Sequence, residues 1–221
     1  MNHTTTVSER AKRPERITLT GCTVRLEPLD PAKHADALWS GLGGASAENL
    51  WLYMPDGPFV ERAVFDSHVQ AKAESEDPLF FAIVDRATDT AIGRATLMRI
   101  DPPNRVIEVG GIIYTPTLQR SRGATEAMYL FARYVFDDLG YRRYEWKCNA
   151  LNERSRRAAL RLGFTFEGIF RQHMIIKEKN RDTAWFSMLD SEWPARKREF
   201  ERWLDESNFD AAGMQKTRLN Q

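Results

Sequence analysis

The chain has 221 residues, which is enough for one sizeable domain with its own hydrophobic core. Lysine and arginine total 32 against 31 aspartate and glutamate, so the net charge is +1 and lacks the basic excess typical of nucleic-acid binders. Two cysteines and four scattered histidines give no metal-ligand spacing, and no apolar run suggests a membrane span or a secretory signal. We therefore expect a cytoplasmic protein without a metal, a nucleic-acid partner or a membrane partner.

Both ends of the sequence lack an apolar pattern, and this sets the expected domain organisation. Residues 1–16 are predicted to form a flexible arm and residues 206–221 a flexible tail. A single domain is expected over residues 17–205.

Hydrophobic periodicity predicts a mixed α/β (α+β) fold. A strand, a crossover helix and another strand are expected over 105–148, which makes that pair parallel within an otherwise antiparallel sheet. The predicted strands are 17–29, 79–84, 91–100, 105–114, 143–148, 164–176 and 183–189, with a turn over 178–182 before the last. The predicted helices are 32–41, 59–73 (with Phe59, Ala63, Val64 and Val69 inward), 124–138, 152–163 and 193–204.

The segment from Ile107 to Arg133 combines a strand, a polar turn and a helix start. Pro116 ends the strand, and an apolar stripe at three- and four-residue spacing begins at Ala124. The first backbone N–H groups of a helix have no internal partner, so Arg120 and Arg122 beside them indicate an anion site. The alternative is an ordinary strand–turn–helix corner with solvated arginines.

The turn in this segment reads Gln119-Arg120-Ser121-Arg122-Gly123-Ala124. It resembles the acetyl-CoA-binding motif Q/R-x-x-G-x-G/A of the GCN5-related N-acetyltransferases (GNAT). The first position matches, the last is an allowed alanine, and Arg122 stands where the family has glycine. Gly123 follows one place later and would let a ligand approach the backbone closely.

A second motif supports the same resemblance. The run Asn149-x-x-Asn152-x-x-Ser155-x(6)-Leu162-Gly163-Phe164-x-x-Glu167-Gly168 is similar to the family's downstream strand–helix junction. The two motifs lie about one βαβ unit apart and together cover about residues 105–170. Within the family, the sequence most resembles the ribosomal-protein N-terminal acetyltransferase (RimJ/RimL-like) branch.

The resemblance implies a fold, an activity and a cosubstrate. The fold is a largely antiparallel twisted sheet of six to seven strands, with helices on both faces and a central parallel pair splayed to admit acetyl-CoA. The activity is transfer of an acetyl group from acetyl-CoA to a primary amine, on a protein N-terminus or a small molecule, by direct attack. The implied cofactor-binding residues are Ile112, Ile113, Thr115, Gln119, Arg120, Ser121, Arg122, Gly123, Ala124, Thr125 and Asn152.

Two residues are candidates for catalysis. Glu108 lies between Ile107 and Val109 in an apolar strand, and partial burial would raise its pKa, as suits a general base. The alternative places Glu108 on a solvent-facing side of the strand. Ser155 resembles the family residue near the sulfur of CoA and would hydrogen-bond the leaving thiolate; the alternative is an exposed helix serine. Asn152, assigned above to the cofactor, also suits a plain helix cap.

The aromatic loop over residues 51–59 has two interpretations. Trp51, Tyr53 and Met54 either wall a substrate pocket or plug the edge of the core. The sequence does not choose among acceptor amines.

Two further function classes stay open. The chain could be a non-catalytic acyl-CoA-binding regulatory module, an alternative that the Arg122 departure supports. A homodimer through the aromatic helix over 193–204 is the third expectation, and it is compatible with catalysis.

Overall fold

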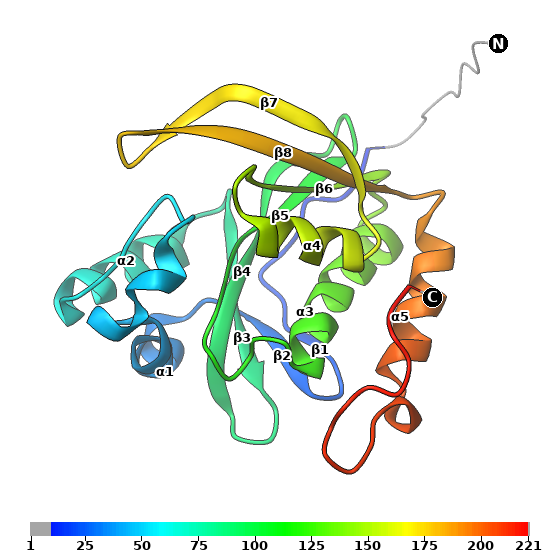
Figure 1. Ribbon diagram of the computed structural model, residues 1–221, viewed down its shortest axis with the longest axis horizontal. Coiled ribbons are helices and arrows are strands. Elements are labelled where there is room, and N and C mark those ends of the chain that lie inside the picture. The colour runs from blue at the N-terminus through cyan, green and yellow to red at the C-terminus, as the bar shows by residue number, and fades with distance from the viewer. Residues whose placement is uncertain (1–9, 221) are drawn as a thin grey trace.

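The computed structural model describes residues 10–220, in which eight strands form one sheet in the order β1-β2-β3-β4-β5-β6-β8-β7 (Figure 1). Every neighbouring pair is antiparallel except β5 and β6, which run parallel. The strands are β1 (Leu19–Thr20), β2 (Val24–Pro28), β3 (Leu79–Asp85), β4 (Thr90–Asp101), β5 (Val106–Tyr114), β6 (Arg143–Asn149), β7 (Thr165–Ile176) and β8 (Lys179–Leu189). The predicted mixed α/β class with one central parallel pair is confirmed, although the sheet has one strand more than the expected six to seven.

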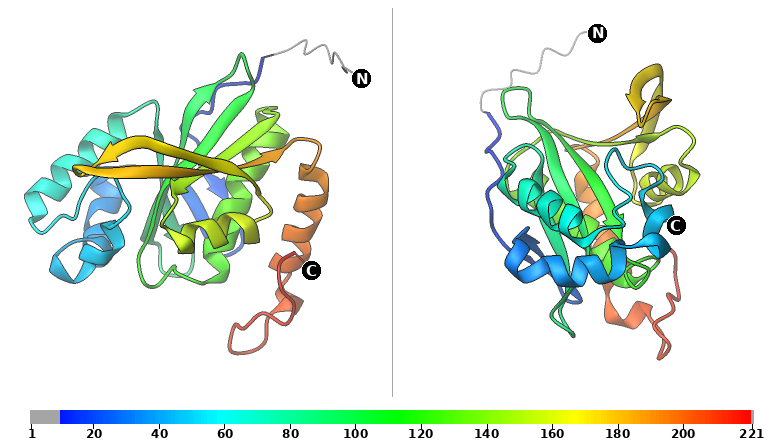
Figure 2. Two further views of the ribbon diagram at one scale, coloured as in Figure 1. Left: turned by 45° about the horizontal axis from the view of Figure 1, so that its top comes forward. Right: turned by 90° about the vertical axis from the view of Figure 1, so that its left-hand side faces the viewer.

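Helices cover both faces of this sheet, as Figures 1 and 2 show. Helices α1 and α2 pack over β3 and β4 on one face, and α3 packs with α5 on the other. The helices are α1 (Pro31–Leu42), α2 (Arg62–Glu74), α3 (Arg122–Arg133), α4 (Glu153–Arg161) and α5 (Trp193–Leu204). Shorter helical turns are η1 (Ala45–Trp51), the π-helical η2 (Tyr134–Asp138) and η3 (Glu206–Asn208).

A bulge in β5 separates the two halves of the sheet. Pairing between β5 and β6 ends at Val109 and Trp146, and the following pairs of β5 with β4 leave one extra residue on β5. Gly111 lies in this bulge with φ of 57°, a left-handed conformation that glycine adopts without strain. Because a bulge bends its strand, β5 turns away from β6 here, which opens the parallel pair.

Two local predictions were wrong. Of the four residues predicted to face inward around helix α2, Phe59 and Val69 are buried, but Val64 is 52% exposed and Ala63 is also exposed, and Phe65 is buried instead. The last hairpin turns tightly at Lys177 and Glu178, which both have positive φ, rather than over residues 178–182. Polar strand residues were mistaken for turn residues because this hairpin projects beyond the core.

The ends of the domain are also packed. In the predicted arm, residues 1–9 lie outside the described residues, but the amide of Lys12 donates to the Leu139 carbonyl at 2.9 Å. In the expected flexible tail, Leu219 is buried and the side chain of Asn208 bonds both Trp203 and Thr217. The segment 206–220 therefore folds back onto α5.

Asn208 gives a direct test of that packing. Its Nδ2 donates to the Trp203 carbonyl at 2.9 Å, and its Oδ1 accepts from the Thr217 amide at 2.9 Å. Asn208→Ala leaves these buried groups unpaired, so we expect the free energy of unfolding to fall by about 1–3 kcal/mol. The measurement is the thermal midpoint, which should drop by about 2–4 °C per kcal/mol. The exposed Asn49→Ala serves as the control; equal midpoints for both variants would contradict the packing role.

Candidate active site

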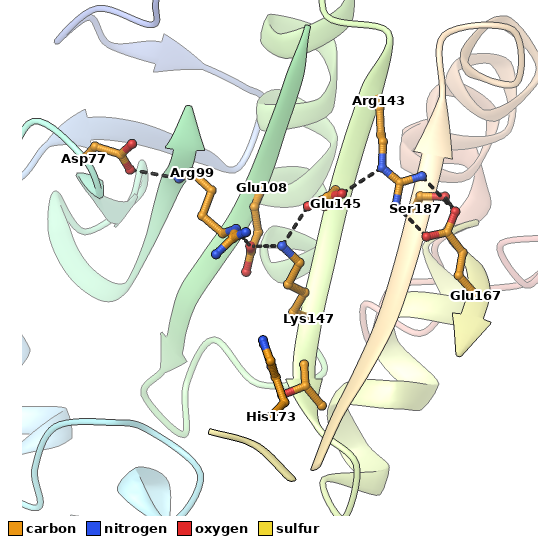
Figure 3. Close-up of polar contacts among 10 residues, drawn as sticks. Asp77, Arg99, Glu108, Arg143, Glu145, Lys147, Glu167, His173 and Ser187 are labelled. Carbon is orange, nitrogen blue, oxygen red and sulfur yellow. Dashed lines mark hydrogen bonds and ion pairs between the residues drawn. The ribbon is translucent and has the colours of Figure 1, made fainter. Parts of the chain in front are cut away.

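Glu108 lies on β5 one residue before the parallel pairing ends. Its neighbours Ile107 and Val109 enter the core under α3, so strand alternation places Glu108 on the opposite face. Helices α1 and α2 cover the β3 and β4 part of that face. Over β5 and β6 the face carries the charged side chains of Glu108, Arg143, Glu145 and Lys147 instead (Figure 3).

The charged side chains form one connected row, contributed by β4, β5, β6 and β7 and shown in Figure 3. Lys147 Nζ lies 2.9 Å from Glu108 Oε2 and 2.7 Å from Glu145 Oε2. Arg143 then joins Glu145 to Glu167, with its Nε 2.7 Å from Glu145 Oε1. At the other end, Arg99 Nε lies 3.5 Å from Glu108. These contacts fix the rotamer of Glu108 at the edge of the gap.

The electrostatics of Glu108 suit a proton acceptor. Burial raises the pKa of Glu108, and the nearby charges of Lys147 and Arg99 oppose that rise. Burial acts in the same direction on Glu145, but hydrogen bonds from Lys147 and Arg143 outweigh it and lower its pKa. Lys147 also lies over the Trp185 ring at 3.7 Å, so its ammonium contacts two carboxylates and an aromatic face.

A hollow of about 660 Å³ adjoins this cluster. Arg99, Glu145 and Trp185 contribute to its lining. Arg99 and Glu145 also belong to the row of charges around Glu108, so the hollow lies beside that row on the side of the sheet opposite α3.

The β5 backbone beyond the bulge contains the predicted cofactor-binding residues Ile112, Ile113 and Thr115. Ile113 packs into the core beneath α1 and α2, and Ile112 is half-buried. Both the amide and the hydroxyl of Thr115 donate to the Ile92 carbonyl of β4, at 3.0 and 2.7 Å. Since alternate amides of a strand face opposite ways, Tyr114 rather than Thr115 presents its N–H to the gap.

The turn before α3 is built as a helix N-terminus. Ser121 caps the helix by accepting from the Ala124 amide at 3.1 Å, and Gln119 donates to the Tyr114 carbonyl at 3.2 Å. Arg120 adopts φ of 60° on the exposed side of the turn. Thr125 is buried and accepts from Arg161 at 3.0 Å, which ties α3 to α4. The turn thus leaves the first helical N–H groups available to an anion.

Two residues of the turn, Arg122 and Gly123, also make packing contacts. The Arg122 guanidinium donates to the Leu204 carbonyl and stacks over Phe209 at 4.8 Å, so it anchors the C-terminal segment. A Cβ at Gly123 would lie 2.8 Å from Val24, so glycine here lets α3 pack closely on β2. Both residues thus have packing roles in the folded chain, and their predicted contacts with the cofactor stay predictions.

The start of α4 brings Asn152 and Ser155 together. Asn152 Oδ1 accepts from the Ser155 amide at 3.1 Å, so the predicted cap is present. The Ser155 hydroxyl accepts from Trp146 Nε1 at 3.0 Å and keeps its own hydrogen for another acceptor. Both residues follow β6 where it has parted from β5.

The aromatic loop divides between the two interpretations. Trp51 is fully buried and its indole N–H donates to the Leu42 carbonyl at 2.8 Å, as expected of a residue that closes the edge of the core. Tyr53 is half-buried and donates to the Leu151 carbonyl at 3.2 Å, beside the β6–α4 junction. Met54 is half-buried against the core under α1 and α2. Only Tyr53 reaches from this loop toward the gap.

Sequence reasoning missed the partners of Glu108. The signal was present, because Arg143, Glu145 and Lys147 alternate along β6 with the core residues Tyr144 and Trp146. That alternation shows a charged face but not which strand lies opposite it, so the pairing with Glu108 required the structure.

Comparison with known proteins identifies the fold and the family. An acetyltransferase (GNAT) domain model matches residues 23–165. The crystal structure of a GCN5-related N-acetyltransferase from Brucella melitensis is 51% identical, with a TM-score of 0.94 and 96% of each chain covered. A probable GNAT-family acetyltransferase from Chromobacterium violaceum is 34% identical, with a TM-score of 0.81, covering 88% of this chain and 98% of its own. The chain belongs to the GNAT acetyltransferase family.

The fold is also shared with a more distant enzyme whose acetyl acceptor is known. The Salmonella typhimurium acetyl transferase that modifies the N-terminal serine of 50S ribosomal subunit protein L7/L12 is 18% identical, with a TM-score of 0.67, covering 78% of this chain and 99% of its own. At that identity the likeness concerns the fold alone. No curated protein matches the sequence.

Residues 10–220 contain neither a membrane-spanning helix nor a metal-binding cluster. No helix in this range is long and apolar enough to cross a membrane. In the same range no three His, Cys, Asp or Glu side chains are grouped so that they could hold a metal ion.

Proposed function

We propose that this protein is an acetyl-CoA-dependent N-acetyltransferase that acts on a primary amine by direct attack. The observation that carries the proposal is the position of Glu108, which is buried beside the point where β5 and β6 part. Acetyl-CoA, typical of the family, serves as cosubstrate. Its pantetheine would add to the free edge of β5 near Tyr114, with its phosphates at the start of α3.

In this proposal Glu108 accepts the proton that the acceptor ammonium must lose. The amine nitrogen then attacks the thioester carbonyl, the carbon–sulfur bond breaks, and the CoA thiolate leaves; the second proton, which the nitrogen releases as the amide forms, neutralises that thiolate. Ser155 donates a hydrogen bond to that thiolate, and backbone N–H groups of β5 stabilise the oxyanion. Asn152 orients α4 and holds its Oδ1 on the Ser155 amide. No covalent enzyme intermediate is required.

The acceptor class includes protein N-termini and small amines. A protein N-terminus, the acceptor of the Salmonella typhimurium enzyme, is one candidate, and the hydrogen bond from the Tyr53 hydroxyl to the Leu151 carbonyl joins the aromatic loop to the β6–α4 junction beside the gap. A homodimer remains a prediction.

The proposal is tested by acetyl-CoA consumption, read as free thiol, with N-terminal peptides, polyamines, amino acids and amine drugs. Thermal stabilisation by acetyl-CoA is measured in parallel. Acceptor-dependent thiol release establishes the transferase. Stabilisation with no release from any acceptor favours the regulatory module instead.

Ser155→Ala tests the thiolate donor. Removing the hydroxyl should lower kcat about tenfold, equivalent to about 1.4 kcal/mol of transition-state stabilisation, with the KM for acetyl-CoA little changed. The exposed Ser67→Ala on α2 is the control. Equal kcat values for both variants would remove Ser155 from the mechanism.

A further inference from the structure

Strand β8 lies on the other side of β6 from β5 and contributes to the sheet face that carries Glu108. Trp185 lies under the Lys147 ammonium, and Thr183 Oγ1 lies 2.9 Å from His173 Nδ1. Arg181 precedes them at the same two-residue spacing, so strand alternation places it on the same side of the sheet. This side chain has no assigned role in the proposed reaction.

Arg181 lies on β8 just beyond the last residue that pairs with β6. Pairing of β6 with β8 ends at Asn149 and Thr183, and the Ala150 amide donates to the Asp182 carbonyl at 2.8 Å. Arg181 is therefore beside the junction where β6 leaves the sheet for α4. That junction carries Leu151, the partner of Tyr53.

The guanidinium of Arg181 is unpaired within residues 10–220. Its Nε is buried and has no hydrogen-bond partner there, and no carboxylate of that range forms an ion pair with it. Burial lowers the pKa of Arg181, and the nearby Cys148 thiol and Glu108 carboxylate oppose that effect. Arg143 and Arg94 on the same sheet, by contrast, both pair with carboxylates. A half-buried cation without a partner is costly unless a ligand supplies the anion.

A second unsatisfied donor lies on the same strand face. Trp185 Nε1 is buried without a partner among the described residues, and Trp185 lines the hollow beside Glu145. Both unsatisfied groups are donors, which match oxygen acceptors rather than a second ammonium. Lys177, whose Nζ donates to the Trp51 carbonyl at 3.0 Å, adds positive charge where the hairpin meets the aromatic loop.

We propose that Arg181 binds an oxyanion of the acceptor, so that the acceptor is an amine that also carries a carboxylate or a phosphate. The ammonium would lie at Glu108 and the oxyanion at Arg181, two groups of opposite charge on one face of the sheet. Polyamines and polycationic drugs are disfavoured, because they would bring further ammonium groups to an unpaired guanidinium. The inference rests on the proposed acetyl transfer and narrows its substrate class.

The test uses matched amines with and without the anion. Thiol release from acetyl-CoA is compared for 4-aminobutyrate against butylamine, phosphoethanolamine against ethanolamine, a free amino acid against its amide, and spermidine. For the wild type we expect kcat/KM at least about tenfold higher for the anionic member of a pair, as a charge-assisted hydrogen bond provides. The pair with the larger ratio distinguishes carboxylate from phosphate. Ligand-observed NMR in the presence of CoA measures binding of the same compounds independently of turnover.

Arg181→Gln should abolish that preference while leaving the KM for acetyl-CoA unchanged, and Arg181→Lys should retain part of it. The exposed Arg171→Gln on β7 is the matched control and should behave as wild type. The proposal is overturned if neutral amines or spermidine bind or react as well as the anionic ones, or if none of the anionic compounds binds. A raised KM for acetyl-CoA with unchanged acceptor preference would reassign Arg181 to the cosubstrate. Failure of acetyl transfer itself would show as no thiol release from any amine, whatever the NMR result.

Discussion

Glu108→Gln is expected to lower kcat roughly 10²- to 10⁴-fold, the usual contribution of a general base. The amide cannot accept the ammonium proton, yet it keeps the shape of the side chain between Arg99 and Lys147. Binding of acetyl-CoA, measured by thermal shift, should not change, because Glu108 lies on the acceptor side of β5. The exposed Glu74→Gln on α2 is the control.

The pH dependence of kcat/KM should reflect the ionisation of the Glu108 carboxylate. A base works when it is deprotonated, so kcat/KM falls as the pH drops through the pKa of Glu108. Burial raises that pKa, so the acid limb should lie above the range of an ordinary carboxyl group. The charge of Lys147 opposes the rise; in Lys147→Met the limb should therefore move to higher pH.

The shift of the acid limb in Lys147→Met shows whether the group that titrates is Glu108 or the amine substrate. The pKa of the free amine is the same in wild type and Lys147→Met, so a limb due to the amine would stay in place. An unchanged profile in Glu108→Gln, with kcat near the wild-type value, would exclude Glu108 as the base.

The architecture was accessible from the sequence because local patterns specify it. Pro116, the polar turn after it and the apolar stripe from Ala124 define a strand, a turn and a helix that are present in the structure with small boundary shifts. A strand on each side of one crossover helix requires a parallel pair. A hydrophobic period of 2 residues indicates a strand and one of 3.6 residues indicates a helix, so these elements can be predicted without knowledge of tertiary contacts.

The site was less accessible because its chemistry depends on strand neighbours. Glu108 was identified as a candidate base, but its pairing with Lys147 arises from the parallel register of β5 and β6. The position of Arg122 in the turn suggested that it binds an anion. In the structure its guanidinium donates to the Leu204 carbonyl of the C-terminal segment, a contact that the sequence pattern does not indicate. Arg181 was assigned to a turn because its neighbours are polar. The hairpin extends beyond the core here, so its residues lack the apolar alternation by which a strand is recognised.

Glu126→Ala is expected to be the most destabilising of the substitutions considered. Glu126 is buried on α3, and its carboxylate accepts from the amides of Cys22 at 2.6 Å, Thr23 at 2.7 Å and Val24 at 3.0 Å. The Thr23 hydroxyl also donates to it. A Cβ at Gly21 would lie 2.6 Å from this carboxylate, so the turn between β1 and β2 closes directly over it.

Removing that carboxylate leaves three backbone donors at the β1–β2 turn without an acceptor. Each unsatisfied group costs about 1–3 kcal/mol, and partial hydration of the turn reduces the sum to about 3–5 kcal/mol. The thermal midpoint should therefore fall by about 10 °C, at about 2–4 °C per kcal/mol for a chain of this size. Glu126→Gln keeps one acceptor oxygen and should lose less, while Glu74→Ala should lose little. Because the same carboxylate holds α3 against β2, the loss should also weaken acetyl-CoA binding at the start of α3; a stable variant that binds as wild type would show that packing alone positions the helix.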